Sequence, residues 1–271
     1  MAACASLDAD VLGLQEVDRG QARSAGVDQT EAVARGTGAA AWRFEPAIVG
    51  EPGGVWRPAA ADGGGAADGA IGGTDGEAAY GVGLVSRLPV REWHVVHLPP
   101  ARVRSPVYVP GRHTFILLPD EPRAAVAALV EGPAGPVWVA NCHLSFVPGW
   151  NAVQLRRLTR ELAGLGHPCV LLGDLNLPGT VPGRVSRWRT LAQAKTFPAD
   201  EPKLQIDHAL GHGPLPPVTA VDGRRLSLSD HRALVVDLGA GGRHSVPSEH
   251  ARRLPAGSPA PPARRRWWRL H

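Results

Sequence analysis

The sequence predicts an α/β fold, and three observations lead to that prediction. Short apolar runs, rich in Val and Leu and bounded by Gly or Pro, are typical of buried strands. Residues 150–164 carry the apolar spacing of an amphipathic helix. Acidic, amide and histidine side chains follow several of the strand-like runs, where a rigid scaffold commonly presents its chemistry.

The first half of the chain is predicted to hold strands, one helix and one long loop. The apolar run over residues 10–14 predicts a strand that ends by residue 17. Residues 28–35 are predicted to form a short helix capped by its first residue, an Asp. Residues 50–79, rich in Gly and Ala, are predicted to form a flexible loop. Strands are then expected at residues 80–86 and 91–98.

The second half continues with a hairpin, a helix and further strands. Residues 124–130 and 137–140 are expected to pair around a Gly- and Pro-rich turn. In the helix at residues 150–164, leucines form one apolar stripe and arginines lie away from it. Further strands are predicted at residues 169–172, 218–221 and 233–238, and a loop with a short helix at residues 178–195.

Polar residues at the ends of these runs are the strongest sign of function. If the ends meet at one rim, their carboxylates repel one another unless a cation lies between them. A hard divalent ion with oxygen ligands resolves this repulsion, and Mg²⁺ is the common choice. The residues concerned are Glu16, Asn141, His143, Asp174, Asn176, Asp207, Asp230 and His231.

Five short motifs in a fixed order resemble the endonuclease/exonuclease/phosphatase superfamily, the DNase I-like metal-dependent phosphoesterases. They are LGLQEVD (12–18), HLS (143–145), GDLN (173–176), IDH (206–208) and SDH (229–231). The resemblance runs over residues 8–238. It implies two packed mixed β-sheets flanked by helices, a four-layer α-β-β-α sandwich.

The resemblance also implies a metal site and a histidine–carboxylate pair. Glu16 would be a ligand of Mg²⁺, for which Mn²⁺ could substitute. Asp230 would be a second ligand or would position water. His231 would contact the scissile phosphate, and Asp207 would hydrogen-bond His231 and fix its tautomer.

Other residues would complete the catalytic site. By the same resemblance, Asp174 would orient or deprotonate the attacking water, and Asn176 would bind the phosphate. His143 would be an additional acid or base, and the sequence does not decide which of the two histidines has which role. Arg123 and Asn141 are expected to contact the substrate.

For some of these residues, a purely structural role is the alternative to a functional one. GDLN is also compatible with a plain turn after a strand, and His143 with a hydrogen-bonded structural histidine. Asp207 could act only structurally, and Arg123 could be an exposed strand start. Glu77, near the strand at residues 80–86, is a further candidate for orienting His143.

The family pattern begins earlier than this chain does, with a strand that ends in Asn. Residues 1–10 resemble the end of the helix that follows that strand. An absent strand inside a sheet would leave backbone groups unpaired. We therefore expect the native start to lie upstream.

Composition limits the class of protein. Hydrophobic residues make up 44% of the chain, enough for a core, and no apolar run is long enough to span a membrane. Three Cys without CxxC spacing argue against a disulfide scaffold or a zinc site and predict a reducing, cytoplasmic location. We expect a monomer with one catalytic domain over residues 1–240 and a disordered Pro/Arg-rich basic tail over residues 241–271.

The expected reaction is Mg²⁺-dependent hydrolysis of a phosphoester, with a phosphodiester favoured. Nucleic acid is the favoured substrate, because several loops are basic. A phospholipid or a small phosphorylated metabolite is the alternative substrate, because the tail carries the excess positive charge and the body is close to neutral. The rival hypothesis is a non-catalytic protein that tethers nucleic acid or membrane through its tail. The basic loop residues are Arg102, Arg104, Arg184, Arg187 and Arg189.

Overall fold

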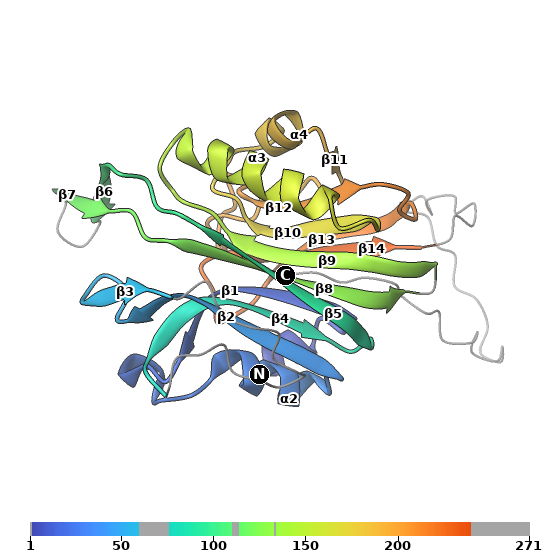
Figure 1. The fold of residues 1–271 in the computed structure, drawn as a ribbon, viewed down its shortest axis with the longest axis horizontal. Helices are drawn as coiled ribbons and strands as arrows, with labels where there is room; N and C mark the ends of the chain where they lie inside the picture. The colour runs from blue at the N-terminus through green and yellow to red at the C-terminus, as the bar shows by residue number, and fades with distance from the viewer. Residues whose placement is uncertain (1, 60–75, 110–113, 133, 240–271) are drawn as a thin grey trace, which may run out of the picture.

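The structure is a computed structural model that describes residues 2–59, 76–109, 114–132 and 134–239. Its helices and strands form layers around two sheets (Figure 1). The predicted basic tail, and residues 60–75 of the predicted flexible loop, lie outside the described residues. In the part of the chain that the structure describes, no helix has the length and apolar character needed to cross a membrane.

The smaller of the two main sheets is antiparallel and has the order β1-β4-β2-β3. Its outer face is covered by α2, which begins after Asp28; the Asp28 side chain accepts a hydrogen bond from the backbone N–H of Glu31, as the sequence predicted. The elements of this half are α1 (Ala2–Ala5), β1 (Val11–Arg19), the 3-10 turn η1 (Ala22–Ser24), α2 (Gln29–Thr37), β2 (Ala41–Gly50), β3 (Trp56–Pro58) and β4 (Ala79–Ser86).

The larger sheet is mixed and has the order β11-β12-β10-β9-β8-β5, with β9 and β10 parallel. Helices α3 and α4 lie on its outer face (Figure 1). Its elements are β5 (Val90–Leu98), β8 (Arg123–Gly132), β9 (Gly135–His143), α3 (Trp150–Ala163), β10 (Cys169–Asp174), α4 (Val181–Ser186), β11 (Arg189–Thr190) and β12 (Asp207–His212). The predicted β8–β9 hairpin is confirmed.

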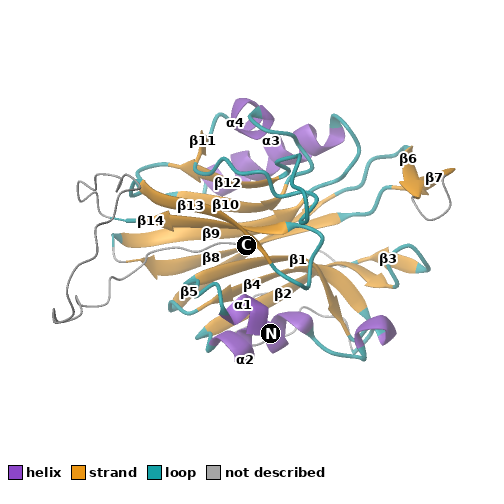
Figure 2. Cartoon of the chain, turned by 180° about the vertical axis from the view of Figure 1, so that it is seen from behind, coloured by secondary structure: helices purple, strands orange, loops and turns teal. Residues whose placement is uncertain are grey.

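Two further two-stranded sheets complete the described fold. Strands β13 (Val218–Arg225) and β14 (Arg232–Leu238) pair with each other and lie near β12. Strands β6 (Arg104–Val109) and β7 (Thr114–Pro119) form a ribbon that projects away from the sandwich, as Figures 1 and 2 show from opposite sides.

The two largest clusters of buried apolar side chains lie on the two faces of the larger sheet. Between the sheets, Val82 and Leu84 of β4 pack with Val126 and Val139 of the larger sheet. Between the larger sheet and α3, Leu155, Leu158 and Leu162 of the predicted leucine stripe are fully buried, and Leu165 is partly buried. The order helix, sheet, sheet, helix confirms the four-layer α-β-β-α fold.

The prediction of a loop over residues 50–79 is wrong at both ends of that range. Residues 56–58 form β3, which pairs with the end of β2, and β4 begins at Ala79. Strand β3 is held by backbone pairing, and its residues are half-buried or exposed, so it has no apolar pattern that would mark it. All three cysteines are free and buried, and burial raises the pKa of each thiol.

Candidate active site

Three candidate catalytic residues lie side by side in one row across the larger sheet. His143 ends β9, Asp174 ends the neighbouring β10, and Asp207 begins β12 on its other side. Asp174 is in register with both His143 and Asp207. Gly173 has a φ of 139°, and a Cβ there would lie 1.8 Å from the carbonyl oxygen of Cys142. Only glycine therefore allows β9 and β10 to approach so closely at this point.

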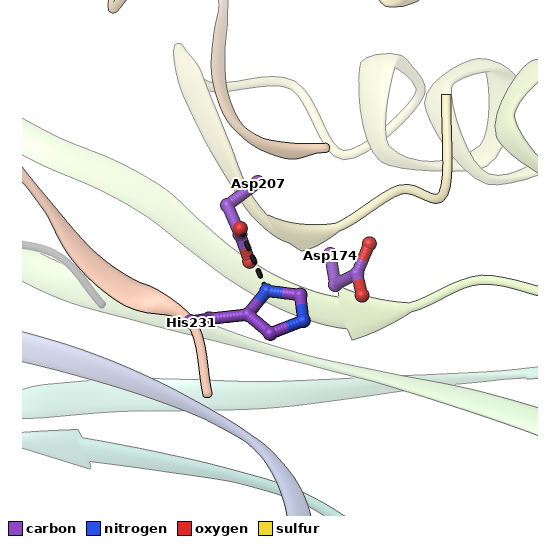
Figure 3. A group of neighbouring side chains, drawn as sticks. All are labelled: Asp174, Asp207 and His231. Atoms are coloured by element: carbon purple, nitrogen blue, oxygen red, sulfur yellow. Dashed lines mark hydrogen bonds and ion pairs between the residues drawn. The ribbon is translucent and has the colours of Figure 1, made fainter. Parts of the chain in front are cut away.

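His231 and Asp207 form a hydrogen-bonded pair, with 2.8 Å between Nδ1 and the Asp207 carboxylate. Figure 3 shows Nδ1 turned towards Asp207 and the other ring nitrogen on the side of Asp174. Ligand atoms of Asp174, Asp207 and His231 all lie within 4.8 Å of one another. Burial acts to lower the pKa of His231, but the Asp207 hydrogen bond and the charges of Asp207, Asp174 and Asp230 raise it to about 9. His231 is therefore protonated at neutral pH.

Asp174 is a buried carboxyl group in a negatively charged environment. Burial and the charges of Asp207 and Glu16 raise its pKa to about 7. The hydrogen bond from the backbone N–H of Asn176 and the charge of His231 act in the opposite direction and lower the pKa. That N–H donates to the Asp174 carboxylate at 2.8 Å. Asn176 has a φ of 50°, and its side-chain amide also donates to the carbonyl of Leu144. The GDLN segment is thus the end of β10 followed by a bend at Asn176, which holds Asp174 at the rim.

His143 is buried between Arg123, Glu16 and Asp174. The Arg123 guanidinium lies 3.4 Å from Nδ1. Nε2 lies 3.7 Å from the Asp174 carboxylate and 3.3 Å from the Asn176 amide nitrogen. Burial and the charges of Arg123 and His231 lower the pKa of His143 well below its usual value, so the ring is neutral.

Glu16 does not follow the end of a strand, which corrects the sequence-based expectation. Strand β1 continues to Arg19, and Glu16 lies on a bulge between Leu14 and Val17 with a φ of 54°. Such a bulge re-aims a side chain. The Glu16 side chain is 64% exposed, and its carboxylate lies 3.8 Å from Nδ1 of His143.

Tyr80 is a member of the site that the sequence did not reveal. It hydrogen-bonds Glu16, and burial together with the charge of Glu16 raises its pKa. The Arg23 guanidinium lies over its ring and also bonds both carboxylate oxygens of Asp18. Asp18 and Tyr80 are register partners on β1 and β4. This contact depends on strand pairing, and no local sequence pattern marks it.

Arg123 is not an exposed strand start, because it is only 6% exposed at the beginning of β8. Its Nε has no hydrogen-bond partner among the described residues, and neither has Oδ1 of the buried Asp120, which lies 3.9 Å from the guanidinium. Glu77 does not orient His143, because it forms an ion pair with Arg57 on the surface.

Asn141 was expected to contact the substrate, but its side chain lies between the two sheets. Its side chain is fully buried, and its amide donates to the carbonyls of Leu14 at 2.8 Å and Gly83 at 2.9 Å. Its oxygen accepts from the Gln15 amide. With its hydrogen-bonding groups taken up between the two sheets, Asn141 has none left for a substrate; it joins β9 to β1 and β4.

We therefore predict that Asn141→Ala lowers stability. The substitution leaves two buried carbonyls and one amide without a partner, which costs about 2–4 kcal/mol in free energy of unfolding. Urea unfolding measures this loss, with the exposed Gln193→Ala as the matched control. A loss below about 0.5 kcal/mol would contradict the assigned role.

A cavity of about 650 Å³ adjoins these residues and is lined by Glu16, Asp207, Asp230 and His231. It separates β1 from β14, and no described strand lies between these two. Both expected metal ligands, Glu16 and Asp230, are exposed to solvent.

The donor set fits an oxygen-liganded divalent cation. Carboxylates approach the rim from β1, β10, β12 and the loop before β14, and burial together with the charges of Asp207 and Glu16 raises the pKa of Asp174. Mg²⁺ and Mn²⁺ prefer such ligands. The tightest group of possible ligands is Asp174, Asp207 and His231 rather than the expected Glu16 and Asp230. Because Asp207 is already bonded to His231, its carboxylate has less capacity left for a metal.

Comparisons with known proteins agree with the fold. A sequence model of the Endonuclease/Exonuclease/phosphatase family matches residues 1–231. A crystal structure of an endonuclease/exonuclease/phosphatase from Beutenbergia cavernae DSM 12333 is similar, with a TM-score of 0.58 and 22% identity over 89% of this chain. This chain spans 65% of the length of that protein. A family protein from Leptotrichia buccalis C-1013-b has a TM-score of 0.57 at 12% identity, covering 88% of this chain and 91% of its own.

A search of curated proteins gave no match. At these identities the solved structures show the fold alone. The family match covers most of the sequence and includes every motif identified above. The chain therefore belongs to the endonuclease/exonuclease/phosphatase family.

Proposed function

We propose that this protein is a Mg²⁺-dependent hydrolase of phosphoester bonds, and specifically a phosphodiesterase or nuclease. One observation carries the proposal: the Asp207–His231 pair and Asp174 meet at a rim whose cavity also includes Glu16 and Asp230. Members of the family are generally phosphoester hydrolases.

The carboxylates of Glu16 and Asp230 would hold the ion, with Mn²⁺ as a possible substitute. Bound there, Mg²⁺ would supply a Lewis acid that polarises a non-bridging oxygen and offsets developing charge. Tyr80 would help to fix the exposed Glu16 carboxylate by donating its hydroxyl hydrogen. The bulge in β1 turns Glu16 towards His143 and so towards the rim.

Asp174 would accept a hydrogen bond or a proton from the attacking water. Its pKa near 7 suits a general base at neutral pH. The Asn176 backbone N–H fixes one carboxylate oxygen and leaves the other for water. The Asn176 side-chain amide, which lies 3.3 Å from Nε2 of His143, would donate to a phosphoryl oxygen.

Cationic and neutral donors surround the position of the phosphate. Protonated His231 would donate its Nε2–H to a phosphoryl oxygen, while Asp207 keeps the ring oriented and charged. Arg123 would add a second cation if its unpaired Nε–H met the substrate. The neutral His143 would donate a hydrogen bond from its ring N–H to the leaving oxygen.

A substrate panel tests the proposal. We expect Mg²⁺-dependent cleavage of bis(p-nitrophenyl) phosphate and of DNA or RNA, abolished by EDTA and restored by Mg²⁺ or Mn²⁺. Lipid phosphodiesters and inositol phosphates in the same panel identify the other substrate classes. Asp8→Asn, an exposed acid that pairs with Arg87, is the control and should keep the full rate. A folded protein that cleaves none of these with either ion would contradict the proposal.

A further inference from the structure

The arginines of the described residues fall into two groups. Most form ion pairs or hydrogen bonds, as Arg35, Arg57 and Arg91 do with glutamates. The others are exposed, and their side chains have no hydrogen bond or ion pair with any residue that the structure describes. This unpaired set consists of Arg102, Arg104, Arg156, Arg157, Arg160, Arg184, Arg187 and Arg189.

Six of the unpaired set lie on α3, on α4 or directly after α4, and we call the surface formed by the whole set the arginine face. Arg156, Arg157 and Arg160 occupy the exposed arc of α3, opposite the buried leucine stripe. Arg184 lies on α4, and Arg187 and Arg189 follow it. Helices α3 and α4 pack together over the outer side of the larger sheet (Figures 1 and 2).

The arginine face begins at the catalytic loop. In the first turn of α3, Asn151 donates to the backbone carbonyl of Asn176 at 2.8 Å. Trp150 and Gln154 donate to the carbonyl of Pro99 at 3.0 and 2.9 Å, which ties the segment before Arg102 and Arg104 to the same helix end. A ligand on this face can therefore extend to the site.

Little negative charge opposes these arginines. Glu161 is the one acidic residue of α3, and it is bonded to His94; α4 and β11 contain none. A membrane surface would also require apolar side chains that insert between lipids. On α3 and α4 the exposed large apolar residue is Val153, whereas the nearby Trp188 is 7% exposed and stacks on His212. Guanidinium groups without apolar anchors suit a chain of phosphates.

We propose that the arginine face binds the phosphate backbone of a nucleic acid and guides it to the catalytic rim. This inference rests on the proposed function and narrows it, because it names nucleic acid as the substrate class. Unlike the catalytic site, the face requires no divalent cation to bind its ligand.

The test measures binding of the full chain to a fluorescent single-stranded DNA in EDTA, at several salt concentrations. Arg156→Gln, Arg157→Gln and Arg160→Gln are combined in one variant. Loss of three phosphate contacts should lower the slope of log affinity against log salt by about 2, and the affinity at ~0.1 M salt by at least tenfold.

The matched control combines Arg35→Gln, Arg57→Gln and Arg91→Gln. It removes the same charge from exposed arginines, with 79%, 57% and 58% exposed side chains. Its slope should change by less than ~1, because these arginines make no phosphate contact. Equal effects of the two variants would show that DNA binding depends only on the net charge of the protein, and this would overturn the proposal. Circular dichroism verifies folding, and Arg184→Gln with Arg189→Gln is the second variant should the first not fold.

Two further results separate this proposal from the proposed function. Unchanged DNA binding by both arginine-face variants would overturn the proposed role of the arginine face, even if the wild type hydrolyses bis(p-nitrophenyl) phosphate. Loss of DNA binding that is confined to those variants would support the proposed role of the arginine face, even if the wild type hydrolyses none of the substrates. Phosphatidylserine vesicles are the comparison ligand; loss of vesicle binding without loss of DNA binding would overturn the nucleic-acid assignment.

Discussion

Asp174→Asn is expected to lower turnover at least a hundredfold and, at pH 8 without divalent cation, to stabilise the fold. Loss of activity follows from removal of the base beside the attacking water. Stabilisation follows because burial, Asp207 and Glu16 raise the pKa of Asp174 from 3.8 to about 7. The unfolded chain therefore releases this proton at lower pH than the folded chain does, which destabilises the wild type as pH rises from about 4 to 7.

The expected gain is roughly 2–4 kcal/mol above pH 7, from the size of the shift. It should shrink as pH falls towards 4, where the unfolded carboxyl group also begins to bind the proton, and it should shrink when Mg²⁺ is added. Thermal unfolding at pH 4.5 and 8, with and without Mg²⁺, measures it, and Asp8→Asn is the control. An Asp174→Asn protein that is active, or less stable than wild type at pH 8, would contradict the description of this carboxyl group.

Asp207→Asn is expected to make activity strongly pH-dependent. Asp207 keeps the pKa of His231 at about 9, and without this carboxylate the pKa should fall towards its ordinary 6.5. The alkaline limb of the pH–rate profile should move to lower pH by up to about two units. Activity at pH 8 should fall more than ~10-fold, while activity at pH 6 should stay within several-fold of wild type.

His231→Ala is the comparison, because it removes the donor at every pH and should cost at least ~100-fold at both pH 6 and pH 8. The same pair contributes to stability: its contribution is complete below about pH 6.5 and is lost as pH rises through about 9. An Asp207→Asn profile parallel to wild type would show that Asp207 has no influence on the catalytic protonation of His231.

Local sequence patterns predicted the parts of the fold that have a strong period. The leucine stripe of α3 and the apolar run of β10 were found in this way, because burial of one face or of a whole strand constrains residue type. The same runs placed His143 and Asp174 at strand ends, whereas Asp207 begins β12, a strand that the sequence analysis did not predict. The register of β9, β10 and β12 puts the three residues in one row.

What the sequence could not provide depends on contacts between distant segments. The bulge at Glu16 and its Tyr80 partner follow from the pairing of β1 with β4. Asn141 looked like a substrate contact because it lies two residues before His143. Only the packing of the two sheets shows that its amide is committed to Leu14 and Gly83.

Titration of the metal-free protein with Mg²⁺ by isothermal calorimetry tests the central claim most directly, since it reports binding without turnover. Wild type is expected to bind the ion at one site, and Glu16→Gln is expected to bind it at least tenfold more weakly, while Asp8→Asn matches wild type. A folded wild-type protein that takes up neither Mg²⁺ nor Mn²⁺, or a Glu16→Gln protein with unchanged affinity, would contradict a cation site at this rim.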